Sequence, residues 1–166
     1  MNLALVDLYL ERRRIRAEIV MGRFTRVSDA LDNVRTGFLA ATIPLSSLGP
    51  GDATAEANTV SCDLVLRLDD IRLVCPIEEP PPDAAPADGR RPRERVPVTL
   101  DIGEWQVIGE LYLADRVGWI DFMAAAKGHF LPLVQATVRS ADLATPATYE
   151  FVLVNADRVS ALYEET

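Results

Sequence analysis

The chain carries one hydrophobic pattern twice, and this repeat restricts its fold more than any other feature. When the sequence is shifted by 92 residues, residues 4–39 fall on residues 96–131 without a gap, and apolar positions mostly coincide. The stretch GFLAAT at 37–42 then corresponds to HFLPLV at 129–134. Identities are few, but the alternating phase never slips, which is typical of a duplicated module.

The repeat continues towards the end of each copy with an offset of 88 residues. The matching apolar positions are Leu64, Leu66, Ile71 and Leu73 in the first copy and Val152, Val154, Val159 and Ala161 in the second. The smaller offset fits a longer loop at 46–58 in the first copy, where Gly and Pro mark a loop. We therefore predict a duplicated and fused gene.

A segment rich in proline and charge separates the two copies. Residues 78–95 read EEPPPDAAPADGRRPRER and contain no large apolar side chain, so they cannot offset the entropy cost of ordering. The sequence thus predicts a first β-rich repeat at 1–77, a flexible linker at 78–95 and a second β-rich repeat at 96–166. The linker arginines Arg90, Arg91, Arg93 and Arg95 are interpreted as a solvated or partner-binding tail.

Each copy is predicted to contain five short strands and one short helix. Residues 6–10 and 15–21 alternate apolar and polar side chains around the polar turn 11–14, which predicts a hairpin. Ser28 or Asp29 is expected to cap a helix in the first copy, and Gly128 to end one in the second. The predicted class is mainly β (α+β), with two tandem small antiparallel sheet or barrel modules of order ββαβββ.

The last two strands of each copy are predicted to form a tight hairpin. A turn at Leu68–Asp69 would pair Leu66 with Ile71, and a turn at 156–157 would pair Val154 with Val159. Cys62 would then lie opposite Cys75, where two buried thiols are favoured over a disulfide or a metal site.

The charge of the chain argues against a nucleic-acid partner. The 166 residues carry a formal net charge of −8 with a pI near 4.7, so a polyanion is repelled unless a local basic patch intervenes. Asp7 interrupts the first apolar run and the arginines follow it, unlike a secretory signal. No segment has the apolar length of a membrane span. We predict a cytoplasmic protein without a membrane partner.

The sequence contains few residues that could form a catalytic, metal or cofactor site. His129 is the single histidine, and two cysteines do not complete a zinc site with it. The carboxylates that coincide between copies, Asp29 with Asp121 and Glu18 with Glu110, are interpreted as structural. No phosphate-binding, dinucleotide-binding or hydrolase motif occurs. We predict no catalytic residue, no metal, no cofactor and no enzymatic activity.

The densest basic cluster is ERRRIR at 11–16. Its R-x-x-x-R spacing, Arg12 to Arg16, resembles the start of a PilZ cyclic-dinucleotide-binding domain, which implies phosphate binding by Arg12, Arg13, Arg14 and Arg16. The downstream D/N-x-S-x-x-G of that family is absent, and the second copy has no arginine at this place. A solvated turn is the favoured interpretation.

The second copy is apolar on both faces of its strands, which predicts a sheet covered on both sides. The predicted interaction surface comprises Trp105, Trp119, Phe122, Phe151, Leu153 and Leu162.

Parts of both copies resemble an uncharacterised bacterial family of short proteins. That family shows R-x-S-D-x-L-N, F-L-x-L-x-x-A and V-N-x-x-x-I patterns. The matching residues here are Arg26, Ser28, Asp29, Leu31, Asn33, Phe130, Leu131, Leu133, Ala136, Val154, Asn155 and Val159. The resemblance implies small β-rich modules and no known chemistry, and the hairpin ends are similar to Sm-like barrels in shape only.

We therefore predict a scaffold or interaction protein that binds a protein partner and self-associates into a homo-oligomer. The alternative is a module that senses a nucleotide or nucleic acid through Arg12–Arg16.

Overall fold

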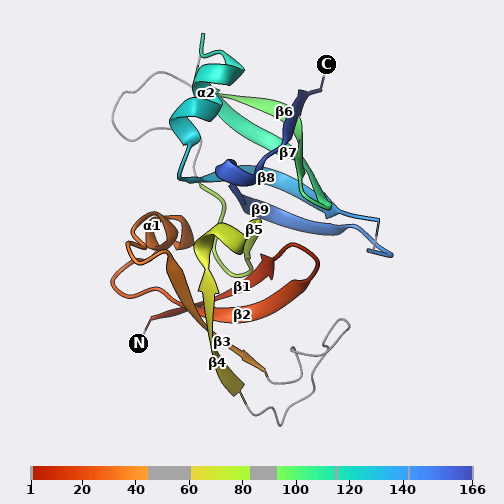
Figure 1. The fold of residues 1–166 in the computed structure, drawn as a ribbon. Helices are drawn as coiled ribbons and strands as arrows, with labels where there is room; N and C mark the ends of the chain where they lie inside the picture. Colours follow the sequence, from red (N-terminus) through yellow and green to blue (C-terminus); the bar gives the residue numbers. More distant parts are fainter. Residues whose placement is uncertain (1, 45–60, 83–92, 115, 142, 166) are drawn as a thin grey trace. The chain divides into compact units, whose positions relative to one another are not determined.

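The computed structural model describes residues 2–44, 61–82, 93–114, 116–141 and 143–165, and it divides into two compact units. Unit 1 comprises Met1–Glu79 and unit 2 comprises Pro80–Thr166. Both units are mainly antiparallel β-sheet with one short α-helix each, so the predicted mainly β class is confirmed (Figure 1).

Unit 1 contains five strands. In chain order they are β1 (Leu3–Tyr9), β2 (Arg14–Val20), β3 (Phe38–Pro44), β4 (Ser61–Arg67) and β5 (Leu73–Pro76). Helix α1 (Val27–Asp32) lies between β2 and β3, and a 3₁₀ turn (Leu68–Asp70) separates β4 from β5. The strands are ordered β5-β1-β2-β3-β4 across the sheet.

Unit 2 also contains five strands. They are β6 (Arg93–Ile102), β7 (Trp105–Ala114), β8 (Phe130–Arg139), β9 (Ala147–Asn155) and β10 (Ala161–Glu164). Helix α2 (Trp119–Ala126) lies between β7 and β8, and a 3₁₀ turn (Ala156–Arg158) precedes β10. Their order is β10-β6-β7-β8-β9, and the described strands of neither unit close into a barrel.

One face of the unit 1 sheet forms the core of that unit. Val6 pairs with Ala17, and Leu8 pairs with Ile15, so these four side chains share a face and are all buried. The same face continues through Ala41 of β3, and α1 adds further buried apolar residues, namely Val27, Ala30 and Leu31. The alternation seen in the sequence therefore places the core as predicted.

In unit 2, β9 is covered on both faces from Phe151 to Asn155, as β1 is from Val6 to Tyr9 in unit 1. Strands β7 and β8 shift register between Ile108 and Glu110. Gly109 lies at this bulge, where a Cβ would approach the carbonyl oxygen of Val134 to 3.1 Å. A side chain at 109 would therefore be packed tightly against β8.

The predicted hairpin between the last two strands is wrong in both units. Strand β4 pairs with β3, and β5 pairs with β1, so Leu66 faces Leu39 rather than Ile71. In unit 2 Val154 faces Leu131, not Val159. The reason is that each 3₁₀ turn redirects the chain to the opposite side of the sheet instead of folding it back on itself.

The two cysteines consequently lie apart. Cys62 pairs with Ile43, Cys75 pairs with Asp7, and the two residues are not opposite each other. Both remain thiols, with Cys62 half-buried and Cys75 buried.

Gly128 follows the end of α2 with a φ of 81°, as predicted, but the predicted cap of the first helix is wrong. Helix α1 begins after Arg26 with no capping side chain from Ser28 or Asp29. Instead the carboxylate of Glu79 accepts a hydrogen bond from the Val27 amide at 2.8 Å and contacts Arg26 at 3.2 Å. Glu79 belongs to the segment predicted as linker, as do Arg93 and Arg95 at the start of β6, whereas residues 83–92 lie outside the described part.

Candidate interaction surface

The arginine cluster surrounds a buried carboxylate. Asp7 has no solvent exposure, and Arg14 contacts its Oδ2 through Nη2 at 2.7 Å. Arg16 contacts Oδ1 through Nε at 2.8 Å and Oδ2 through Nη2 at 3.1 Å. Cross-strand pairing of Asp7 with Arg16 produces this geometry, because directly opposed residues share a face. Two of the four predicted ligand-binding arginines therefore compensate a buried negative charge.

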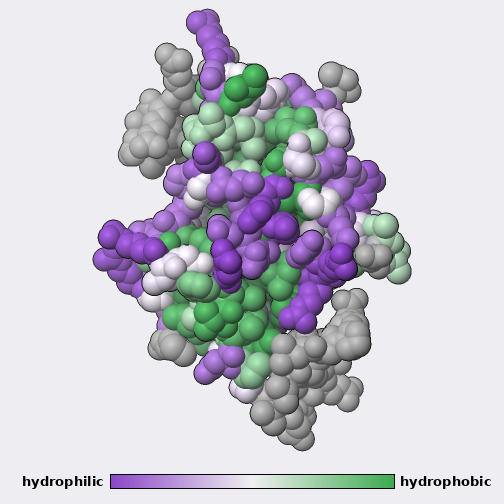
Figure 2. Space-filling view, viewed as in Figure 1, coloured by the Kyte–Doolittle hydropathy of each residue, from purple (hydrophilic) through white to green (hydrophobic). Residues whose placement is uncertain are grey.

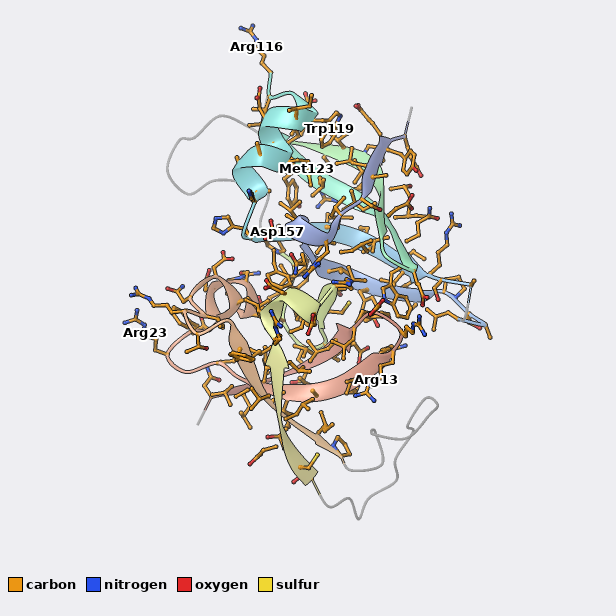
Figure 3. All side chains as sticks on the ribbon, in the orientation of Figure 1. Arg13, Arg23, Arg116, Trp119, Met123 and Asp157 are labelled. Atoms are coloured by element: carbon orange, nitrogen blue, oxygen red, sulfur yellow. The ribbon has the colours of Figure 1, made fainter. Side chains whose placement is uncertain are left out.

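The other two arginines, Arg12 and Arg13, lie exposed in the turn between β1 and β2. Figure 3 labels Arg13. The aromatic ring of Tyr9 lies under the guanidinium of Arg14 at 5.8 Å, which further fixes that side chain. The cluster thus divides into a fixed pair and an exposed pair.

Apolar side chains form a row across the outer face of the unit 1 sheet, opposite its core. Leu3 pairs with Val20, and Ala40 pairs with Val65. Val20 and Ala40 lie one position beyond the Ile19–Ala41 pair, so they continue the same row. Exposure is 38% at Leu3, 37% at Val20 and 67% at Val65. We call these four residues the apolar row.

Phe38 extends this row along β3. It lies two positions before Ala40 on the same face and is 50% exposed. Figure 2 shows hydrophobic residues gathered over the strands of unit 1 on the visible face. Contiguous exposed apolar surface of this kind is characteristic of protein-interaction sites, whereas single exposed residues are ordinary.

The surface predicted in the second copy is largely inaccessible. Trp105, Phe151 and Leu153 are buried, so no partner can reach them. Trp119, Phe122 and Leu162 are half-buried. The indole of Trp119 donates a hydrogen bond to Glu164 Oε2 at 2.7 Å, and its ring meets Phe122 edge-on with centroids 5.8 Å apart. Trp119 therefore fixes α2 (Figure 3).

The sequence reasoning missed the residues that are exposed. Val65 follows Leu64 and precedes Leu66, so three successive apolar residues already indicated that one apolar side chain of β4 lies on the face opposite the core. In unit 2, Ile120 on α2 is 86% exposed, although it is flanked by the half-buried Trp119.

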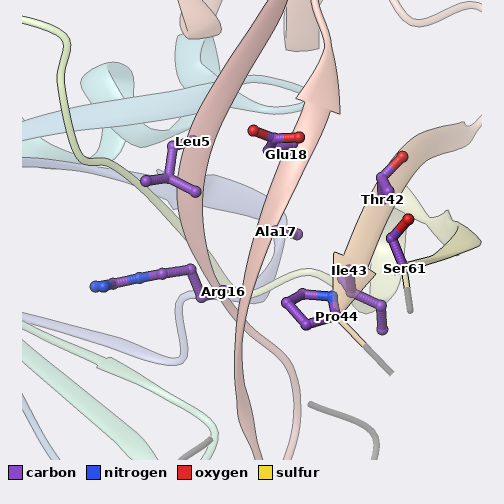
Figure 4. A pocket seen from close by; sticks show the side chains of 8 residues that line it. All are labelled: Leu5, Arg16, Ala17, Glu18, Thr42, Ile43, Pro44 and Ser61. Atoms are coloured by element: carbon purple, nitrogen blue, oxygen red, sulfur yellow. The ribbon is translucent and has the colours of Figure 1, made fainter. Parts of the chain in front are cut away.

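A pocket of about 310 Å³ lies where β2 and β3 diverge (Figure 4). It is lined by Leu5, Arg16, Ala17, Glu18, Thr42, Ile43, Pro44 and Ser61. At one end of the pocket the strands pair through Glu18 and Thr42. Its wall is mainly apolar, and among the described residues that line it only Arg16 and Glu18 are charged.

Unit 2 carries a polar network around Asp101. Its carboxylate accepts hydrogen bonds from Gln106 Nε2 at 2.8 Å and from the Tyr163 hydroxyl at 2.9 Å. Arg139 donates to Gln106 Oε1 at 2.7 Å. The hydrogen bond to Asp101 and the negative charge of Asp101 raise the pKa of Tyr163 above its ordinary value of 10.0. These bonds tie β10 to β6 and β7.

Groups for catalysis do not converge within the described residues. His129, in which the sequence found no catalytic partner, is exposed at the start of β8. Asp29 and Asp121 occupy the first turns of two different helices, in different units. No group of three or more His, Cys, Asp or Glu side chains that could hold a metal occurs in the described part of the chain. Neither helix in that part has the length and apolarity to span a membrane.

Comparison with known proteins returned no relative: the chain matches no model of a protein family, no curated protein and no solved structure.

Proposed function

We propose that this protein is a non-enzymatic interaction protein, built from two fused copies of one small β module, that binds protein partners and self-associates. The observation that carries the proposal is the apolar row on unit 1, because its side chains lie exposed on four adjacent strands. The cytoplasm remains the predicted location.

The strand registers support the two-copy part of the proposal. Val6 pairs with Ala17 in unit 1, and Val98 pairs with Gly109 in unit 2, at an offset of 92 residues. Three further pairs are related by the same offsets, which are 92 for residues before the loop at 46–58 and 88 for residues after it. These are Glu18–Thr42 to Glu110–Val134, Leu39–Leu66 to Leu131–Val154, and Leu8–Val74 to Leu100–Leu162.

Backbone hydrogen bonds outside the strand ladders repeat in the same way. The bond from the Arg72 amide to the Tyr9 carbonyl corresponds to that from Ser160 to Asp101. Three others also recur: Ile77 to Leu5 as Glu165 to Pro97, Leu68 to Gly37 as Ala156 to His129, and Ala30 to Arg26 as Phe122 to Gly118. Matching turns and caps are difficult to obtain by chance from two unrelated small sheets.

The residues of unit 2 that correspond to the apolar row differ from it in type and in exposure. Arg95 replaces Leu3, and its guanidinium lies over the ring of Tyr112, the equivalent of Val20, at 5.5 Å. Leu153, the equivalent of Val65, is fully buried, and Phe130 is 8% exposed where Phe38 is 50% exposed. The exposed apolar surface is thus a property of unit 1, and divergence between the copies has left it open.

Light scattering over a range of protein concentrations tests the proposal. We expect concentration-dependent association for the wild type. Val20→Lys should weaken it about tenfold, since a charge in a contact that becomes buried costs on the order of 1.4 kcal/mol or more. Thr148→Lys, at an exposed position of β9, is the matched control. Equal association of wild type and Val20→Lys would remove the apolar row from the proposal.

The alternative function is binding of a nucleotide or nucleic acid through Arg12–Arg16. The exposure of Arg12 and Arg13 favours it, and Arg16 is still 54% exposed. A phosphate would nevertheless compete with Asp7 for Arg14 and Arg16. Titration with cyclic dinucleotides and short RNA at two salt concentrations distinguishes the two functions, because phosphate contacts weaken as salt rises. Binding that disappears in Arg12→Ala with Arg16→Ala would favour the alternative.

A further inference from the structure

Strand β4 is an open edge of the unit 1 sheet. Its only hydrogen-bonded neighbour among the described strands is β3. The register with β3 is regular from Phe38–Arg67 to Pro44–Ser61, and β4 contains neither proline nor a bulge. Natural proteins usually shorten, bend or cover such edges because they template pairing with another chain. By contrast, β10 is only four residues long.

The sequence of β4 is self-complementary in charge. Asp63, Leu64, Val65, Leu66 and Arg67 place opposite charges at equal distances on either side of Val65. Asp63, Val65 and Arg67 point to the exposed outer face, whereas Leu64 and Leu66 point to the core face and are half-buried. The charged side chains remain accessible: Asp63 accepts a 3.3 Å hydrogen bond from Thr42, and Arg67 lies 3.9 Å from Asp69.

We propose that β4 pairs antiparallel with β4 of a second copy of the chain, with the two-fold axis at Val65. This inference rests on the proposed self-association and names its site. Each Asp63 then faces Arg67 of the other copy, Val65 faces its own symmetry mate, and Leu64 faces Leu66. The contact is isologous, so it closes at a dimer.

Other registers pair these side chains poorly. An antiparallel register centred on Leu64 places Asp63 opposite Val65, and one centred on Leu66 places Arg67 opposite Val65. If one strand slides by a single residue relative to the other, the outer face of one sheet continues into the core face of the other. A parallel, in-register arrangement places Asp63 beside Asp63. Only the register centred on Val65 matches opposite charges and keeps apolar residues together.

The same register makes the apolar row continuous between the two copies. Val65 ends the row that runs through Ala40 and Val20 to Leu3 in one chain. Its symmetry mate begins the identical row in the other chain. Dimerisation at β4 would therefore double the apolar surface that the proposed function assigns to protein binding.

Charge reversal at Asp63 and Arg67 tests the proposed register between the two β4 strands. Asp63→Arg places two arginines opposite each other at both ends of the contact, and Arg67→Asp places two aspartates there. We expect each single variant to dimerise at least about tenfold more weakly than the wild type in analytical ultracentrifugation. Glu150→Arg, an equal charge reversal at an exposed position of β9, should leave dimerisation unchanged.

A mixture of the two single variants should form a heterodimer in preference to either homodimer. In that heterodimer every arginine again faces an aspartate. The double variant Asp63→Arg with Arg67→Asp should recover dimerisation for the same reason. Formation of the heterodimer also shows that the single variants are folded.

The outcomes separate this inference from the proposed function. If both single variants dimerise like the wild type while Val20→Lys does not, the β4 contact is wrong and the apolar row still mediates association. If the mixture shows no preference for the heterodimer, the register is wrong. If the wild type stays monomeric at every concentration, both the contact and the self-association fail.

Discussion

Asp7 shows how one residue can be misjudged from its place in a strand. It alternates with apolar neighbours, so the sequence suggests an exposed polar position that merely interrupts a hydrophobic run. The structure buries it fully, because Arg14 and Arg16 from the adjacent strand cover its carboxylate. The basic cluster was visible in the sequence, but its buried partner depends on the strand register, which local pattern does not determine.

Neutralising Asp7 should destabilise the protein. Asp7→Asn leaves two guanidiniums without their counter-charge, and breaking a buried ion pair costs about 3 kcal/mol or more. Because Arg16 is more than half exposed and can turn to water, we expect a loss of about 2 kcal/mol in the free energy of unfolding measured with urea. Glu150→Gln, the same neutralisation at an exposed strand position, serves as control. Equal stability of the two variants would show that Asp7 is solvated.

Tyr163 should titrate above its ordinary pKa of 10.0. Its hydroxyl donates to Asp101 only when protonated, and the carboxylate charge disfavours the tyrosinate. Because the pKa is raised on folding, the stabilisation is fully present below pH 10 and is lost as the pH rises through the folded pKa. Ultraviolet difference spectra between the wild type and Tyr163→Phe isolate this residue. In Asp101→Asn the same transition should move down towards pH 10. An unmoved transition would contradict the assignment.

At the scale of elements, the sequence predicted what strands and helices exist better than how they pair. The alternation of Val6, Leu8, Ile15 and Ala17 predicted β1, β2 and their hairpin, because a short polar turn forces adjacent strands together. The pairing of β4 and β5 was wrong, since a 3₁₀ turn at Leu68–Asp70 sends β5 to β1. Both arrangements bury apolar side chains, so hydrophobic pattern alone does not choose between them.

The bulge of β8 opposite Gly109 gives a prediction at this scale. In Gly109→Ala the new methyl group would lie 3.1 Å from the Val134 carbonyl oxygen and 3.3 Å from Leu133 Cδ2. We expect a loss of about 1–2 kcal/mol in the free energy of unfolding, which is typical of overpacking. Gly118→Ala is the matched control, because its nearest atom lies at 3.9 Å and its φ is −73°. Similar losses at both glycines would show that β7 and β8 separate readily.

At the scale of the whole molecule, the proposed repeat agrees with the strand pairing in the two units. The offsets of 92 and 88 residues were read from apolar positions alone, yet they also relate strand partners and turn hydrogen bonds that no pattern specifies directly. The repeat does not predict how exposed each side chain is. Phe38 is half-exposed and Phe130 is buried, although the offset of 92 relates the two positions. Exposure depends on the neighbouring side chains, which the hydrophobic pattern does not determine.

Amide hydrogen exchange should therefore show matched protection in the two units. The amides of Leu68, Arg72 and Ile77 correspond to those of Ala156, Ser160 and Glu165, and each donates to an equivalent carbonyl. Because an amide exchanges only when its bond opens, we expect all six to exchange at least ~100-fold more slowly than in an unfolded peptide. Absolute rates will differ where one unit opens more readily than the other, but the protected positions should coincide. A pair in which one amide is protected and its equivalent exchanges at the unfolded rate would contradict a common module, since the turn that closes each sheet would then be held in only one of them.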